Sequence, residues 1–337
     1  MARSCCPSGL KRNALMHRRL PLTVIGGFLG AGKTTLVNHL LRHAEGRRIA
    51  VLVNDFGMIN IDASWIETAA GETIALSNGC VCCQIGGDLA QAISRVLDAP
   101  QPFDAVVVEA SGVSDPWRIA QVGLADPGLS LDSVVVLVDV SSLLEQARDC
   151  LLTDTLERQL RSADFVILNY CDTASDEQLQ RVRNWVASVT PGTPQFETTQ
   201  AAVPPALLYG AALLRESTTA TLKGPAGCDT TWTRHHALEH NHDMVFESWS
   251  CRPTRIFTPV ELQDFFSRPP QGILRLKGVL RSASTPDAAD WVAVELAGRR
   301  IQVRASTSPQ TGAVLVAIGL RGKLPQVELA ACFGATE

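Results

Sequence analysis

A glycine-rich segment near the start of the chain has the residues needed to bind a nucleoside triphosphate. Positions 27–34 read Gly-Phe-Leu-Gly-Ala-Gly-Lys-Thr, the full P-loop pattern, between an apolar run and a helical pattern. The glycines allow backbone N–H groups to converge on phosphate oxygens at a helix N-terminus. We expect Lys33 to reach the β and γ phosphates and the Thr34 hydroxyl to bind Mg²⁺. The predicted nucleotide-binding residues here are Gly27, Gly30, Ala31, Gly32, Lys33, Thr34 and Thr35.

A site for Mg²⁺ and phosphate also requires a carboxylate, and two acids close apolar runs farther along the chain. Glu109 ends one run and is followed by Gly112, whose N–H could contact the γ-phosphate. Asp139 ends the next run and is the competing acid. We predict that Glu109 positions Mg²⁺ or its water and that Lys33 and Glu109 are the catalytic residues. Either carboxylate could instead only cap the loop that follows it.

The residues after a later apolar run, at 165–168, bear on the choice of base. GTPases commonly have Asn-Lys-x-Asp at this place, where the Asp accepts hydrogen bonds from guanine and the Lys stem packs on the base. This chain has Asn169 and Asp172, but Tyr170 replaces the Lys. A tyrosine still offers an apolar ring face, so we predict that Asn169 and Asp172 bind guanine. An ordinary Asn/Asp turn is the alternative.

Three cysteines within four positions, Cys80, Cys82 and Cys83, could hold a soft metal ion. Thiolates favour Zn²⁺ or Cu(I) over Mg²⁺. Three ligands leave a fourth tetrahedral position open to water, a His, a carboxylate or a partner protein. Buried packing cysteines or a redox switch are the alternatives, and we predict a metal site.

Four of the seven histidines occur in one polar stretch, which could be a tether that captures metal. A solvated polar loop is an equal alternative, because a His-rich tract is only a compositional signal. These residues are His235, His236, His240 and His242.

Composition indicates a globular protein with an ordinary core. The apolar fraction is 46% and the charged fraction 19%, which excludes a fibrous or wholly disordered chain. A formal net charge of −4 gives no general basic field for nucleic acid or anionic lipid. The apolar runs fall short of the roughly 18 residues that a membrane span needs. With no apolar signal-peptide core, we expect a cytoplasmic protein without a nucleic-acid or membrane partner.

The order of apolar and helical patterns predicts two domains. Apolar runs alternating with amphipathic helices indicate an α/β fold, a P-loop NTPase parallel sheet with helices on both faces. Farther along, a capping box at Thr258–Glu261 and four strand patterns predict a smaller α+β domain. The predicted parts are a basic disordered leader at 1–19, the nucleotide-binding domain with its Cys-x-Cys-Cys motif at 20–215, a His-containing linker at 216–250 and the C-terminal domain at 251–334.

Several motifs together resemble the CobW-like metallochaperone GTPases, relatives of the GTPases that load nickel into urease and hydrogenase. The resemblance covers nearly the whole chain from Leu22 onward, including a C-terminal stretch at 273–278 that looks like the start of the sheet in the CobW C-terminal domain. The motifs are Gly26–Thr35, Asn54–Gly57, Gly79–Cys83 and Glu109–Gly112, in the order typical of that family.

The resemblance implies a GTPase that binds Zn²⁺ or Co²⁺ at Cys-x-Cys-Cys and passes it to a client protein. It implies one switch segment at Asn54–Asp62 and a second just after Glu109. The chain departs from the family at Asp55, where a Glu is usual, and at Tyr170. Zinc is the first expectation, and cobalt delivery for cobalamin biosynthesis is the next. A P-loop kinase that uses ATP, a nucleotide-binding thiol redox sensor and a homodimer are left open.

Overall fold

The computed structural model describes most of the two predicted domains. The first switch segment, the three clustered cysteines and the four linker histidines lie outside the described residues. Within those residues, no helix is long and apolar enough to cross a membrane. The described ranges are 19–44, 46–53, 73–75, 85–208, 246–283, 289–298, 300–306, 308–309 and 312–334.

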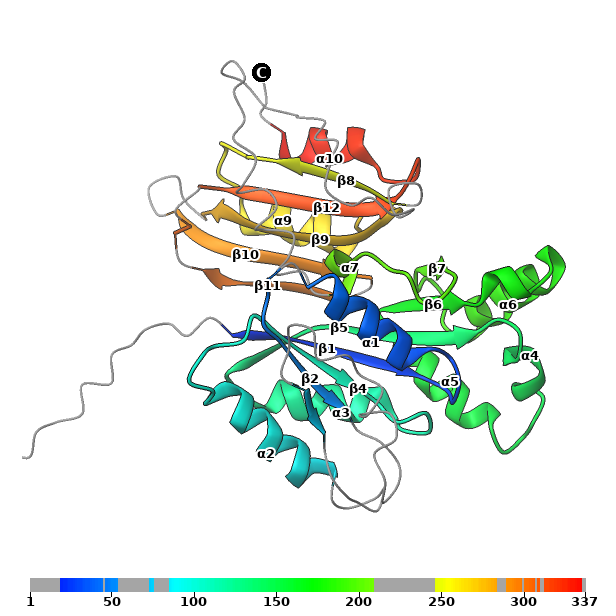
Figure 1. The fold of residues 1–337 in the computed structure, drawn as a ribbon. Helices are drawn as coiled ribbons and strands as arrows, with labels where there is room; N and C mark the ends of the chain where they lie inside the picture. The colour runs from blue at the N-terminus through cyan, green and yellow to red at the C-terminus, as the bar shows by residue number, and fades with distance from the viewer. Residues whose placement is uncertain are drawn as a thin grey trace, which may run out of the picture.

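The first domain is built on a parallel sheet of seven strands in the order β3-β2-β4-β1-β5-β6-β7 (Figure 1). Strands β2, β4 and β6 are almost continuous apolar runs, as expected where both faces of a parallel sheet are buried. This confirms the predicted α/β fold class. The strands are β1 (Leu20–Gly27), β2 (Ile49–Val53), β3 (Thr73–Ala75), β4 (Ala105–Glu109), β5 (Leu129–Asp139), β6 (Phe165–Asn169) and β7 (Gln195–Glu197).

Different elements cover the two faces of this sheet. Side chains alternate along β4, so Val106 and Val108 join one apolar cluster while Ala105 and Val107 join another. Buried residues of α2, α3, α4, α5 and α6 complete the first cluster, and α1 and α7 contribute to the second. The helices are α1 (Lys33–Arg42), α2 (Ile85–Leu97), α3 (Pro116–Ala125), α4 (Leu143–Gln146), α5 (Thr153–Arg161), α6 (Asp176–Val189) and α7 (Pro205–Leu208).

The second domain is an antiparallel sheet of five strands in the order β11-β10-β9-β12-β8. Helices α9 (Pro259–Ser267) and α10 (Gln326–Phe333) cover one of its faces, and their buried residues share an apolar cluster with the sheet. The predicted capping box is present, with Thr258 and Glu261 bonding reciprocally. The strands are β8 (Phe246–Cys251), β9 (Ile273–Ser282), β10 (Asp290–Ala297), β11 (Arg300–Ser306) and β12 (Val314–Leu320).

Strand β8 corrects the prediction that a linker extends to residue 250. It begins at Phe246 and pairs with β12, and Trp249 and Cys251 are buried. The sequence Phe-Glu-Ser-Trp-Ser-Cys contains polar residues at half of its positions, so it has no continuous apolar run. Trp249 and Cys251 join the apolar cluster beneath α9 and α10, whereas Phe246 packs against a different cluster, so the strand shows no simple alternation.

The two sheets share a core. Val314, Val316 and Ile318 of β12 belong to the same apolar cluster as Val135 and Leu137 of β5. The C-terminal sheet thus covers part of a face where helices alone were expected, and Figure 1 shows it above the parallel sheet.

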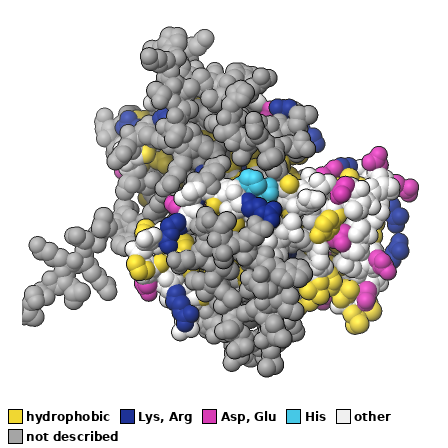
Figure 2. Space-filling model, in the orientation of Figure 1, with side chains coloured by type: hydrophobic (Ala, Val, Ile, Leu, Met, Phe, Trp, Pro, Cys, Tyr) yellow, Lys and Arg dark blue, Asp and Glu magenta, His cyan; other side chains and the backbone are white. Residues whose placement is uncertain are grey.

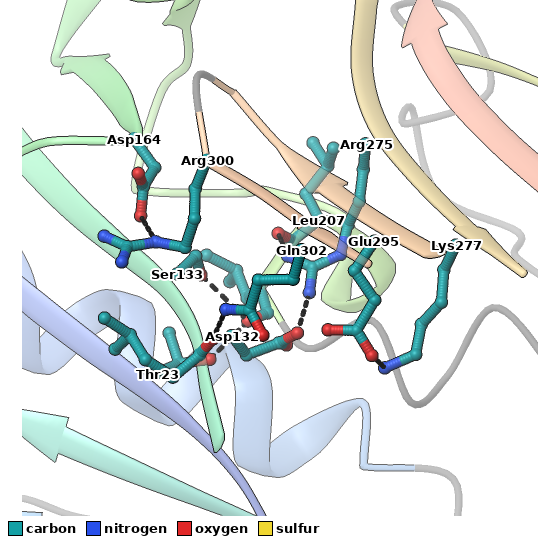
Figure 3. A network of polar contacts seen from close by, with 12 residues as sticks. Thr23, Asp132, Ser133, Asp164, Leu207, Arg275, Lys277, Glu295, Arg300 and Gln302 are labelled. Atoms are coloured by element: carbon teal, nitrogen blue, oxygen red, sulfur yellow. Dashed lines mark hydrogen bonds and ion pairs between the residues drawn. The ribbon is translucent and has the colours of Figure 1, made fainter. Parts of the chain in front are cut away.

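Polar contacts continue this interface along β9 and β11 (Figure 3). Arg275 forms a buried ion pair with Asp132 and donates to the carbonyl of Leu207 at 2.8 Å. Arg300 pairs with Asp164 at 3.0 Å. Away from this interface, acidic and basic side chains intermix over the α4–α6 end of the face in Figure 2.

Candidate nucleotide-binding site

The P-loop connects the end of β1 to the start of α1. Gly32 caps α1 in the left-handed region, with φ 98°. A β-carbon at this position would lie 2.4 Å from Asn169 Nδ2 and 3.3 Å from the Tyr170 hydroxyl, so glycine is required there for both space and backbone conformation. The loop therefore packs directly against the last residue of β6 and the residue that follows it.

The P-loop lysine is held inside its own loop. Lys33 is 8% exposed, and its Nζ donates to the carbonyl of Phe28 at 3.1 Å. A phosphate bound in the loop would offer this ammonium a charged acceptor in place of a neutral one. Thr35, two residues on, is exposed.

The structure brings the P-loop hydroxyl and one predicted acid together. Thr34 Oγ1 donates to Glu109 Oε1 at 2.9 Å, and Glu109 is 2% exposed. The contact follows from the register, because Glu109 ends β4 opposite Ile25 of β1. A hydroxyl and a carboxylate are hard oxygen ligands of the kind that Mg²⁺ prefers. These two residues would hold the ion, which would offset the negative charge of the phosphates when bound.

The competing acid turns toward its own loop. Asp139 Oδ1 accepts from the Ser141 N–H at 2.8 Å and from the Ser141 hydroxyl at 2.6 Å. Its Oδ2 accepts from the Ser142 hydroxyl at 2.9 Å. This is the loop-capping arrangement given above as the alternative for a strand-end carboxylate.

The loop after β4 lies against the P-loop. A β-carbon on Gly112 would come within 2.5 Å of the Leu29 side chain and 2.9 Å of the Leu29 backbone nitrogen. The loop ends at α3, where Asp115 Oδ1 accepts from the Trp117 N–H at 2.9 Å as the helix N-cap. Gly112 thus stands where the P-loop and the segment after Glu109 meet.

The residues predicted to bind the base play unequal structural roles. Asn169 is fully buried, and its Nδ2 donates to the carbonyl of Ala31 at 3.0 Å while its Oδ1 accepts from the Ala201 N–H at 2.8 Å. Asp172 is exposed in the short 3₁₀ turn Cys171–Thr173. Asn169 therefore ties the P-loop to a loop farther along the chain, whereas Asp172 is accessible to a ligand.

A loop that was not predicted from sequence joins this end of the site. Among the described residues, three that are not glycine have a positive φ angle: Tyr170 at 62°, Gln200 at 55° and Ala201 at 52°. Such conformations persist only where the surroundings impose them, and they cluster at functional sites. Gln200 and Ala201 follow β7, so the rule that ligands bind beyond the carboxyl ends of parallel strands would have indicated them.

Cys171 lies in the same turn as Asp172. Burial raises the pKa of its thiol, while a hydrogen bond from the backbone of Thr198 opposes the shift. The Cys171 Sγ donates to the carbonyl of Leu168 at 3.2 Å. The thiol form therefore has a hydrogen-bond partner beside the turn that carries Asp172.

Matches to two family descriptions cover most of the chain. Residues 21–197 match "CobW/HypB/UreG, nucleotide-binding domain", and residues 246–336 match "Cobalamin synthesis protein cobW C-terminal domain". The chain belongs to the CobW/HypB/UreG family of P-loop nucleotide-binding proteins and has the CobW C-terminal domain. This confirms the resemblance identified from the motifs.

Similar proteins include several named for zinc. The chain is 30% identical to the zinc chaperone CobW of Sinorhizobium sp over 90% of its length and 93% of the relative's. It is 28% identical to zinc-regulated GTPase metalloprotein activator 1 of Dictyostelium discoideum, over 80% of this chain and 64% of that protein. The crystal structure of Zn(II)-bound YjiA GTPase from E. coli superposes with a TM-score of 0.46 at 21% identity, covering 94% of this chain and 98% of that one.

Proposed function

We propose that this chain is a GTP-hydrolysing metal chaperone that binds Zn²⁺ through Cys80, Cys82 and Cys83 and passes it to a client protein. GTP hydrolysis is supported mainly by the hydrogen bond between Thr34 and Glu109, which joins the P-loop hydroxyl to the carboxylate at the end of the adjacent strand. Relatives named as zinc chaperones and as a zinc-regulated GTPase support the metal half. Co²⁺ is the second candidate cargo.

The proposed hydrolysis assigns a task to each residue. Lys33 and the P-loop N–H groups bind the phosphates, while Thr34 and Glu109 hold Mg²⁺ and its water shell. Water adds to the γ-phosphorus, the bond to the bridging oxygen breaks, and GDP and phosphate leave. Asp172 accepts from guanine, whereas Asn169 acts through the P-loop and Ala201, because both ends of its amide are already engaged there.

Sheet topology supports coupling between nucleotide and metal. Strand β3 ends at Ala75, and α2 begins at Ile85, so the Cys-x-Cys-Cys motif connects these two elements. Strand β3 is parallel to β2, which is parallel to β4. The chain therefore leaves β3 on the same sheet edge as Glu109. We propose that bound GTP tightens the thiolate site and that hydrolysis loosens the ion for transfer by ligand exchange.

The test measures Zn²⁺ and Co²⁺ affinity by competition titration, with the reduced protein held in GDP or in a non-hydrolysable GTP analogue. We expect tighter binding with the analogue by about 5- to 150-fold, the usual range for coupled sites, and an equal effect of metal on the analogue. Cys82→Ser should abolish this coupling and leave nucleotide binding intact. Equal affinity in both nucleotide states would contradict a nucleotide-gated chaperone.

Lys33→Ala tests the GTPase half separately. It should abolish phosphate release with little change in melting temperature, because the ammonium contacts a loop carbonyl rather than the apolar core. Undiminished GTP turnover in this variant would exclude the assigned site.

A further inference from the structure

A buried glutamine holds the loop between β4 and α3. Gln159 lies on α5 and is 2% exposed. Its Nε2 donates to the carbonyl of Gly112 at 3.0 Å and to the carbonyl of Ser114 at 2.9 Å. Both amide hydrogens are thus used on one loop, and the two carbonyls are satisfied in the interior.

The same glutamine lies beside the P-loop. Gln159 and Leu156 of α5 line a small pocket together with Leu29, whose side chain also packs against Gly112. Helix α5 therefore bonds to the loop after Glu109 and shares a small pocket with Leu29 of the P-loop. A shift of the Gly112 backbone would have to break its bond to Gln159 or displace Leu29.

The orientation of this loop matters because peptide groups are planar. The carbonyl of Gly112 and the N–H of Val113 belong to one trans peptide unit and point in opposite directions. When Gln159 holds that carbonyl toward α5, it also directs the Val113 N–H away from α5. The orientation of the backbone donors in the 112–114 loop is then fixed by a side chain on a different helix.

We infer that Gln159 is a positioning residue that keeps the 112–114 loop in the arrangement that reads the γ-phosphate. The inference rests on the proposed GTPase function. GDP lacks the γ-phosphate and, in the proposed site, would be held by the P-loop and the turn that carries Asp172, so losing Gln159 should leave GDP binding intact. It should weaken binding of the triphosphate and slow its hydrolysis.

The chain provides a matched control. Gln178 of α6 donates its Nε2 to the carbonyls of Val140 and Ser141, each at 3.1 Å. This is a similar two-carbonyl clamp, less buried than that of Gln159, on the loop after β5, the strand on the other side of β1. That loop carries Asp139, whose carboxylate is engaged with its own serines. Gln178→Leu therefore removes an equivalent clamp away from Glu109.

The experiment compares full-length wild type, Gln159→Leu and Gln178→Leu by GDP affinity, affinity for a non-hydrolysable GTP analogue, kcat and melting temperature. In Gln159→Leu we expect unchanged GDP affinity and a kcat lower by about 10²-fold, the scale on which a misplaced reacting group reduces the rate. Analogue affinity should fall by about tenfold, which corresponds to about 1.4 kcal/mol. Gln178→Leu should match wild type in all three nucleotide measurements.

Gln159→Asn provides a second variant if the leucine change prevents folding. It keeps the amide but is one methylene shorter, so one carbonyl can still be reached, and we expect a smaller loss in the same direction. Parallel losses of GDP and analogue affinity, or equal kcat losses in Gln159→Leu and Gln178→Leu, would overturn the inference. If the wild type hydrolyses GTP normally and Gln159→Leu is unaffected, the inference about Gln159 is wrong but the proposed function stands. If the wild type does not hydrolyse GTP, the proposed function is wrong as well.

Discussion

Strands β4 and β5 lie on either side of β1, the strand that leads into the P-loop. Each ends in a carboxylate, and the two carboxylates have different hydrogen-bond partners. Both strands pair with β1, and they end in Glu109 and Asp139. Glu109 accepts from the P-loop residue Thr34, whereas Asp139 accepts from Ser141 and Ser142 of its own loop. Aspartate is one methylene shorter, and its carboxylate readily accepts from the backbone two residues on. The end of a strand thus makes a carboxylate available. The length of its side chain and the residues that follow the strand determine what the carboxylate contacts.

The strongest test of this difference between Glu109 and Asp139 is to neutralise each carboxylate in turn. Glu109→Gln keeps the size and a hydrogen-bonding oxygen but removes the charge that would face Mg²⁺ in the proposed site. We expect phosphate release to slow by about 10²- to 10³-fold, the scale of losing one preorganised electrostatic contact. Asp139→Asn should hydrolyse GTP at nearly the wild-type rate. A larger loss in Asp139→Asn than in Glu109→Gln would reverse the assignment.

A third carboxylate, Asp172 after the end of β6, is the one proposed to recognise the guanine base. In Asp172→Asn the side chain offers an amide in place of the carboxylate that is proposed to accept hydrogen bonds from guanine. We expect GTP to bind about 10- to 100-fold more weakly, which corresponds to losing a hydrogen bond to a charged group, while xanthosine triphosphate binds more tightly. Competition binding with GTP, ATP and xanthosine triphosphate provides the measurement. Equal affinity of the wild type for ATP and GTP would show that Tyr170 removes the guanine preference.

The smallest expected effect concerns stability rather than rate. Asp139→Ala removes the acceptor for the Ser141 N–H and two serine hydroxyls. The free energy of unfolding should fall by about 1 kcal/mol, as for the loss of a helix cap, with turnover retained. Denaturant titration measures the loss. An unchanged unfolding midpoint would mean that the loop does not depend on this carboxylate.

Motif and periodicity were sufficient for the fold class and for most of the central strands. The P-loop, the strand ending at Glu109 and the capping box at Thr258 are local patterns, in which neighbouring residues determine the conformation. Helix α6 was not predicted, although Ser175 accepts from Gln178 as its N-cap and Leu179, Val182 and Val186 have helical spacing. Its polar outer face concealed that period.

The contacts that join distant segments could not be read in the same way. The bond from Asn169 to Ala31 and the clamp from Gln159 to Gly112 connect residues far apart in the sequence. The positive φ of Ala201 is imposed by packing and hydrogen bonding, because alanine has no intrinsic preference for that region. Sequence indicated which residues have suitable chemistry, and the tertiary structure determines their partners.

The cluster shared by the two sheets makes them a single cooperative unit. If the C-terminal sheet detached, Val135 and Leu137 would lose the apolar cover of β12, and Asp132 would lose Arg275. The ion pair would be broken at the same time as the apolar faces of both sheets became exposed to water. Neither sheet can therefore open at low cost while the other stays closed. The free energy that protects the nucleotide-binding sheet from local unfolding is partly supplied by residues more than a hundred positions farther along the chain.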